Sequence, residues 1–249
     1  AAQVWAAAAD DDRYADMDAS ARTHFILDLG ARAYQAEAAG TADATSPAAI
    51  AALLTDISET SHNARQPSIS VRADGAQGGA SIVAVDNQGR TVACSFTMNG
   101  PFGSGEIAPG TGILLAPLPD SARASVPTVA LMANEVIGLT FFAAAGSGAT
   151  PGVVGRIALD TITGSDENMV GAVASPRAFS TGSPDITFVE STMPDQELTT
   201  LRALGHTIEQ RQSIGRVNGF FCPRGLPRVQ TCQFVKDPRS FGLAVSSDE

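Results

Sequence analysis

A glycine-rich turn at residues 146–149 presents backbone groups that could do chemistry. Its sequence, Gly-Ser-Gly-Ala, precedes a segment whose apolar residues recur at helical spacing over 154–162. The first N–H groups of a helix have no partner within the helix and point out of such a turn. We therefore expect Gly148 and Ala149 to be able to hold an anion or an oxyanion. Because the turn lacks the Lys of a nucleotide phosphate site, we expect no nucleotide cofactor.

The chain has three histidines, His24, His62 and His206. They are scattered among different predicted elements, and no Cys or carboxylate stands at a recognised metal-ligand spacing from any of them. His206 follows the Leu-Gly of a predicted helix end, which favours a role as a helix cap. The sequence therefore predicts no metal site.

Two of the three cysteines could form a disulfide. Cys222 and Cys232 flank a Pro-Arg-Gly-Leu-Pro turn between two strand-like runs, a spacing that can place them opposite each other in a hairpin. The other interpretation is a pair of small buried thiols, because two cysteines say little about the redox compartment. We favour the disulfide. Cys94 lies in a strand-like run and is predicted to be a core residue.

The elements that must position these groups fall into a helical part and a β-rich part. Residues 1–60 carry apolar side chains at helical spacing, and Ser46 followed by Pro47 predicts a helix start. Residues 61–79 are polar and rich in glycine, which indicates a mobile linker. From residue 80 onward we expect mixed α and β structure with mostly antiparallel strands.

The β-rich part begins with two predicted hairpins. The first spans 80–98 and turns at Asn87-Gln88-Gly89, and the second spans 128–139. The residues of the first hairpin expected to face inward, themselves or through their immediate neighbours, are Ile82, Ala84, Val92 and Cys94. The remaining predictions are strands at 186–190, 207–211, 215–221 and 229–235 and a helix at 194–204.

Composition excludes several classes of function. A chain of 249 residues with 44% hydrophobic side chains can bury a sizeable core. Its formal charge of −10 would repel phosphate backbones, so we expect no nucleic-acid partner. The longest apolar runs, such as 136–145, are well short of the roughly 20 residues that cross a bilayer. The opening Ala-Ala-Gln suits a signal-cleaved protein, so we expect a periplasmic or extracellular location.

A series of short motifs occurs in the order and spacing of the small subunit of gamma-glutamyltranspeptidases. Over about residues 80–245 the chain resembles this family of N-terminal-nucleophile hydrolases, and the helices over 1–60 are similar to the end of the family's large subunit. Residues 61–79 then correspond to a degenerate processing site. The motifs that carry the resemblance are 81–86 with Gly89, 97–99, 102–105, 112–115, 127–129, 146–149, 175–177, 184–185, 201–206, 213–215 and 237–239.

The resemblance implies that the catalytic nucleophile is missing. In this family a Thr, freed as a new N-terminus by self-cleavage, attacks the γ-glutamyl carbonyl while its own amine acts as the base. Counting back from the Val-Asp at 85–86, the Thr position falls on Gly79 and its neighbour on Ala80, and neither has a hydroxyl. Ser81 lies two residues on and would keep the same strand face, so it is the fallback nucleophile. An ordinary strand serine is the other interpretation of Ser81.

The resemblance also assigns the rest of the pocket. Thr97 and Asn99 match family positions that support the nucleophile and bind the donor substrate, and the family's oxyanion glycines fall on Gly148 and Ala149. Residues 116–121 replace the family's polar glutamate-binding run with Ala-Pro-Leu-Pro-Asp-Ser. We therefore expect structural roles for Thr97 and Asn99. Any ligand would be bound by Asn99 and the backbone donors at Gly148 and Ala149.

The family fold is a four-layer αββα sandwich of the α+β class, and this chain would hold it incompletely because the family's first half is absent. We expect another polypeptide, either an N-terminal half or subunits of an unrelated assembly, to cover the open sheet edges. The resulting hypothesis is a non-catalytic structural or accessory subunit. The alternative is an active γ-glutamyl transferase or hydrolase of glutathione-like γ-glutamyl amides with a non-standard nucleophile.

Overall fold

A computed structural model of the chain describes most of its length. The described residues are 2–11, 13–38, 45–63, 79–100, 102–117, 128–134, 136–148, 150–163, 168–180, 182–226 and 232–246. The helices are α1 (Ala2–Asp10), α2 (Arg13–Asp16), α3 (Ala19–Ala38), α4 (Pro47–Leu54), α5 (Thr150–Thr163), α6 (Met169–Ala174) and α7 (Asp195–Ala203). The strands are β1 (Gly79–Val85), β2 (Thr91–Thr97), β3 (Thr128–Asn134), β4 (Leu139–Ser147), β5 (Ala178–Ser180), β6 (Thr187–Glu190), β7 (Ile208–Arg211), β8 (Arg216–Leu226) and β9 (Gln233–Val235).

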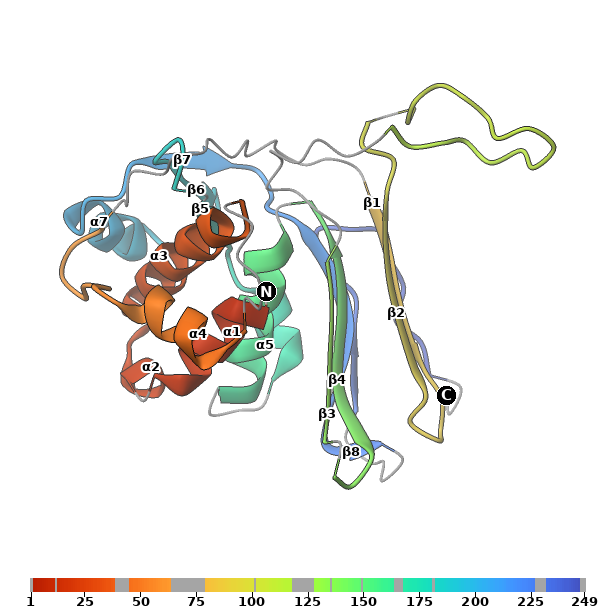
Figure 1. Cartoon of the computed structure of the whole chain (residues 1–249), viewed down its shortest axis with the longest axis horizontal. Coiled ribbons are helices and arrows are strands. Elements are labelled where there is room, and N and C mark those ends of the chain that lie inside the picture. Colours follow the sequence, from red (N-terminus) through yellow and green to blue (C-terminus); the bar gives the residue numbers. More distant parts are fainter. Residues whose placement is uncertain are drawn as a thin grey trace.

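Three layers organise the described part of the chain (Figure 1). The middle layer is an antiparallel sheet with the strand order β3-β4-β8-β9. The helices α1 to α5 lie on one side of this sheet, and the hairpin β1–β2 packs against β4 and β8 on the other side. The second sheet therefore has only two strands within the described residues, and neither of its outer edges is paired there. This is the incomplete sandwich that the sequence predicts.

The middle sheet is apolar on both faces because alternate residues of β4 serve two cores. Phe142 and Ala144 face α5 and join the cluster around Ile157. Ala143, between them, joins Phe220 and the hairpin residues Val83 and Val85. Burial on both faces explains why β4 reads as a continuous apolar run instead of an alternating one.

The hairpin β1–β2 has the predicted turn, but the predicted inward residues point outward. Val83 and Val85 face the middle sheet, whereas Ile82 is 57% exposed and Val92 is 58% exposed. The immediate neighbours of the predicted set thus form the core. Period-2 alternation fixes which residues share a face, but hydropathy does not identify the buried face here, because the inward residues include Ser81 and Ser95 while the outward pairs are all apolar.

The predicted linker at residues 61–79 lies mostly outside the described part of the chain. His62 is packed against α3, and Gly79 already belongs to β1; residues 64–78 lie outside the described part. The helical part is also not a separate unit, because Leu159 of α5 completes the core formed by α1, α3 and α4. The N-terminal helices and the β-rich part therefore share one core.

A small mixed sheet, β5-β6-β7, lies beside α3 together with α7 (Figure 1). Its β6–β7 pair is parallel and α7 makes the crossover, as a parallel connection requires. The sequence predicts β6, α7 and β7. It predicts neither β5, which lies in the passage rich in Pro, Gly and Ser around 175–185, nor α6, which precedes that passage. In this sheet β6 carries Thr187, and the loop before β7 carries His206.

None of the described helices combines the length and the hydrophobicity that a membrane crossing requires.

Candidate functional site

Gly79, the position expected for the nucleophile, is the first residue of β1. Gly79 pairs with Thr97 across the β1–β2 ladder, and a Cβ built on Gly79 would lie 2.6 Å from Cβ of Ser147, beside the glycine-rich turn. The structure thus brings together Gly79, Thr97 and the turn that includes Gly148. However, Gly79 has no hydroxyl, and its surroundings leave no room for a side chain.

Ser81, the fallback nucleophile, lies within β1 and has the contacts of a strand residue. Its Oγ accepts a hydrogen bond from Nδ2 of Asn218 at 2.9 Å, and the residue pairs with Ser95 in the ladder. Ala80 pairs with Phe96 and faces solvent. In an unbroken chain the nitrogen of Ser81 is a peptide amide, so it cannot be the base that this chemistry needs.

Thr97 and Asn99 secure the segment that follows the hairpin. Oγ1 of Thr97 accepts a hydrogen bond from the Asn99 amide at 3.0 Å. Asn99 has a φ of 50°, a left-handed conformation that asparagine tolerates better than most residues. Its Nδ2 donates to the carbonyl of Pro117 at 3.1 Å, which closes the loop over residues 99–117. Both side chains therefore have structural partners.

The predicted oxyanion turn is described only in part. Gly148 has a φ of 68°, in the left-handed region that favours glycine, and follows directly on β4. Ala149 lies outside the described residues. The predicted helix follows as α5, so the strand, the turn and the helix have the predicted order.

Cys222 and Cys232 form the predicted disulfide, with their Cα atoms 4.2 Å apart. The bond closes the loop between β8 and β9. Cys94 has a free thiol and is partly buried on β2.

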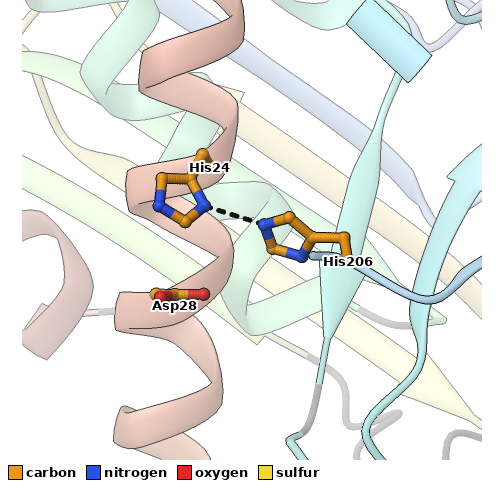
Figure 2. A group of neighbouring side chains, drawn as sticks. All are labelled: His24, Asp28 and His206. Atoms are coloured by element: carbon orange, nitrogen blue, oxygen red, sulfur yellow. Dashed lines mark hydrogen bonds between the residues drawn. The ribbon is translucent and has the colours of Figure 1, made fainter. Parts of the chain in front are cut away.

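The three histidines converge, contrary to the expectation that they are scattered. His24 and Asp28 lie on successive turns of α3, and His206 reaches toward them from the opposite side (Figure 2). Nδ1 of His24 is 2.7 Å from Nε2 of His206. The rings of His62 and His206 stack with centroids 4.1 Å apart. The backbone N–H of His206 caps α7 as predicted, donating to the carbonyl of Leu201 at 3.0 Å, while its side chain is part of a buried polar cluster.

The hydrogen bonds within this cluster fix the tautomers. Nε2 of His24 lies 2.8 Å from the carbonyl oxygen of Ser58, which can only accept, so this nitrogen carries the proton. With one proton on each ring, Nδ1 of His24 accepts from Nε2 of His206, and Nδ1 of His206 accepts from the hydroxyl of Thr187 at 2.8 Å.

His62 is the charged member of the cluster. Its Nδ1 is 2.6 Å from Oδ1 of Asp28, and its Nε2 is 2.8 Å from Oδ1 of Asp185. Burial disfavours the charge on His62, but the hydrogen bonds to Asp28 and Asp185 outweigh it and raise the pKa to about 9. Burial, together with the positive charge of His62, lowers the pKa of His206 to about 3. One imidazolium therefore neutralises the fully buried carboxylate of Asp28.

The raised pKa of His62 and the lowered pKa of His206 together predict that the fold is most stable near pH 6.5, the ordinary histidine pKa. The prediction applies to protein treated with a chelator, in which no metal ion is bound to the histidines. The proton on His62 stabilises the fold fully below pH 6.5, and this contribution is lost as the pH rises toward 9. The neutral state of His206 stabilises the fold fully above pH 6.5, and this contribution is lost as the pH falls toward 3. On either side of pH 6.5 the free energy of unfolding changes by at most about 1.4 kcal/mol per pH unit, and solvent screening near Asp185 reduces this slope. Urea unfolding from pH 6.5 to 9.5 measures the loss of stability as His62 is deprotonated.

His62→Gln is the matched variant for this measurement. It is expected to be less stable overall and to lose the alkaline slope, because glutamine does not titrate. An equal slope in the two proteins would show that another group titrates over this range.

A cavity of about 310 Å³ adjoins the cluster, and Asp28, His62 and Asn63 are in its wall. The rest of the wall comes from α1, α3, α4 and Gly182. Asp28 thus connects the buried histidines to a space that small solutes can enter. The sequence contains one sign of this arrangement, because His24 and Asp28 are four residues apart and share a helix face. His62 and His206 come close to them only through the tertiary fold.

Three motifs of the resemblance meet in a second buried polar network. Arg177 donates from Nη2 to Oδ2 of Asp237 at 2.7 Å, and from Nη1 to the carbonyls of Ile214 and Gly215. The motifs at 175–177, 213–215 and 237–239 therefore support the fold, and the side chain of Asn218 links Asp237 to Ser81.

Comparisons with known proteins agree with this architecture. The gamma-glutamyltranspeptidase family model matches residues 5–121, which include the N-terminal helices and the first hairpin. No curated protein matches the chain.

Several solved structures share the fold. An acivicin-inhibited gamma-glutamyltranspeptidase has a TM-score of 0.53 and 19% identity, over 65% of this chain and 99% of that one. The enzyme from Pseudomonas nitroreducens complexed with L-DON has a TM-score of 0.53 and 18% identity, over 67% and 98%. The transpeptidase CapD of Bacillus anthracis has a TM-score of 0.52 and 16% identity, over 68% and 99%. The chain therefore shares the fold of these gamma-glutamyltranspeptidases, and its residues 5–121 match the model of that family.

Proposed function

We propose that this chain is a non-catalytic gamma-glutamyltranspeptidase-like protein that acts as a structural or accessory subunit of a larger assembly. The observation that carries the proposal is the environment of Gly79. A Cβ there would lie 2.6 Å from Cβ of Ser147 and 2.7 Å from the carbonyl oxygen of Phe96. The nucleophile position has therefore lost both its hydroxyl and the space that a hydroxyl-bearing side chain would occupy.

The replacement of the nucleophile by Ser81 has little support. Its Oγ is bound by Asn218, and the strand β1 continues through Gly79 and Ala80 without a break. A free amine at Ser81 would require cleavage after Ala80, and the first residues of β1 would then lose their pairing with Phe96 and Thr97. Self-cleavage at this point would thus disrupt the hairpin.

The outer face of the β1–β2 hairpin supports a role in assembly. Every residue that points outward from its central rungs is apolar, and the outer pairs are Ala80 with Phe96, Ile82 with Cys94 and Ala84 with Val92. Ile82, Val92 and Phe96 are each more than half exposed. A contiguous apolar sheet face with unpaired strand edges is typical of a surface covered by another polypeptide. We infer that a second chain, either an N-terminal half or another subunit, covers this face.

The disulfide supports an exported protein. Disulfides form and persist in oxidising compartments, so we propose a periplasmic or extracellular location for a chain that holds Cys222 and Cys232 bonded.

One purified sample tests catalysis, processing and assembly together. On a denaturing gel the chain is expected to give one band near 25.5 kDa. With a γ-glutamyl anilide it should show no turnover above background, because it lacks the attacking hydroxyl. In light scattering the chain alone should self-associate through the apolar hairpin face as its concentration rises.

Each readout can contradict a separate part of the proposal. Two bands, a new N-terminus at Ser81 and a turnover that Ser81→Ala abolishes would establish the enzyme. A monodisperse monomer at high concentration would contradict the proposal that another chain covers the hairpin face. The pair Ile82→Lys and Phe96→Glu is a matched control, since it changes only the outer face and should suppress self-association without changing the unfolding midpoint.

A further inference from the structure

We propose that His24, Asp28 and His206 form a binding site for a zinc ion. The inference is independent of the proposed function, because the cluster lies between the helices and the small β5-β6-β7 sheet, away from Gly79 and the hairpin.

The three ligand atoms are gathered in a small space. The ring nitrogens of His24 and His206 and a carboxylate oxygen of Asp28 all lie within 4.8 Å of one another, and all three residues are buried. His24 and Asp28 share one face of α3, and His206 is placed by the turn at Gly205, whose φ is 101° (Figure 2). Two imidazoles and one carboxylate are a three-ligand zinc set, which leaves the fourth position for water.

The groups around the ligands are those that orient metal-binding side chains. The Nε2–H of His24 donates to the carbonyl of Ser58 and leaves the Nδ1 lone pair directed at His206. Thr187 contacts the far nitrogen of His206. Nδ1 of His62 forms a hydrogen bond with Oδ1 of Asp28. Metal-binding histidines nearly always have such a partner on the second nitrogen, and ligating carboxylates are in turn hydrogen-bonded.

A metal ion can replace the proton that now joins the two rings. In the metal-free cluster Nε2 of His206 carries the proton that bridges to His24. On binding, this proton moves to Nδ1 of His206, and the Thr187 hydroxyl changes from donor to acceptor, which a hydroxyl can do. The net number of protons is unchanged. The two nitrogens, 2.7 Å apart, must separate by roughly 0.7 Å for tetrahedral bonds of about 2.0–2.1 Å.

The cavity beside the cluster provides the route of entry. Asp28 is both a ligand and part of the cavity wall, but its side chain is fully buried, so an ion can pass from the cavity to the carboxylate only when neighbouring side chains move. The opposite route is closed by the packed residues of β6 and α7.

Cobalt provides the direct test. The untagged chain, stripped with a chelator, is titrated with Co²⁺, and one equivalent is expected to give the visible absorption bands of a low-symmetry, four-coordinate ion. One equivalent of Zn²⁺ should remove these bands. With Zn²⁺ at about 100 times its dissociation constant, the unfolding midpoint should rise by about 5–10 °C.

Variants separate ligands from supporting groups. His206→Gln and Asp28→Asn should each weaken Zn²⁺ binding by more than about 100-fold, since each removes one of three ligands. Thr187→Val should weaken it by about 10–100-fold, and Thr187→Ser should restore it. Cys94→Ala removes the one free thiol among the described residues and should leave binding unchanged.

Two results would overturn the proposal. The first is a wild-type chain that unfolds cooperatively yet gives neither cobalt bands nor binding heat at tens of micromolar metal, which would identify the cluster as a hydrogen-bonded network only. The second is binding that Cys94→Ala abolishes and the ligand variants leave intact. The wild-type titration decides the question even if a variant fails to fold.

Discussion

Replacing Asp237 with alanine is expected to lower the free energy of unfolding by about 3–5 kcal/mol. The carboxylate is fully buried and accepts hydrogen bonds from Arg177 at 2.7 Å, from the Val217 amide at 2.7 Å and from the Arg239 amide at 2.9 Å. Its loss leaves two amides without an acceptor and the guanidinium of Arg177 buried with carbonyl oxygens alone. Burial already lowers the pKa of Arg177 despite its carboxylate partners.

The effect should be large because Asp237 is part of a wider network. Glu190 accepts from the Ile214 amide at 2.7 Å and from Nε of Arg239 at 2.6 Å. Arg239 also donates to the carbonyls of Val173 and Ser175. One cluster of charges thus joins the ends of α6, β6, β8 and β9. Removing one charge from such a buried network costs more than the pair contributes to stability.

Urea unfolding of single and double variants measures this effect. The cost of Arg177→Ala and Asp237→Ala together should be clearly less than the sum of the two single costs, because each single variant leaves the other charge unpaired. Glu209→Ala is the control, since it breaks an ion pair of similar length, 2.7 Å, in which both side chains are about half exposed. Its cost should be below about 1 kcal/mol. Equal costs for Asp237→Ala and Glu209→Ala would show that the network does not stabilise the fold.

Elements set by local pattern were predicted well from the sequence. The turn at Asn87-Gln88-Gly89 separates β1 from β2, and Ser46 caps α4 with its Oγ accepting from the Ala49 amide at 3.3 Å. The disulfide was also predicted, because Cys222 and Cys232 are close along a hairpin. In each case the determining residues are near one another in sequence, so propensity and spacing carry the information.

Features set by contacts distant in the chain were not predicted. The histidine cluster joins residues that are 182 positions apart in the case of His24 and His206, and no local spacing specifies that contact. The orientation of the hairpin stayed open between the named residues and their immediate neighbours for a different reason. The inward face mixes Val83 with Ser81 and Ser95, whereas the outward face with Ile82 is apolar, so hydropathy did not identify the buried face. An apolar outer face is what a covering chain would need.

Placing a threonine at Gly79, the position we propose for the lost nucleophile, is expected to destabilise the chain instead of restoring catalysis. Gly79→Thr adds a Cβ where Cβ of Ser147 and the Phe96 carbonyl oxygen would be 2.6 Å and 2.7 Å away. One of these neighbours is backbone in the paired strand β2, and Ser147 is buried in β4, so neither can move freely. The cost should be about 3 kcal/mol, the upper part of the range for overpacked sites. Urea unfolding and the γ-glutamyl anilide assay measure the two effects.

Compensation tests the steric cause. Gly79→Ala should destabilise by about 1–3 kcal/mol, and Ser147→Gly in the same chain should recover part of that loss because it removes one of the two close contacts. Gly152→Ala is the control, since a Cβ there meets nothing within 4 Å. In the helix α5 it should stabilise the fold by about 0.5–1 kcal/mol. A Gly79→Thr chain that keeps the wild-type stability, cleaves itself before residue 79 and turns over the anilide would show that the site lacks only its hydroxyl, and the loss of space at Gly79 would then have no functional meaning.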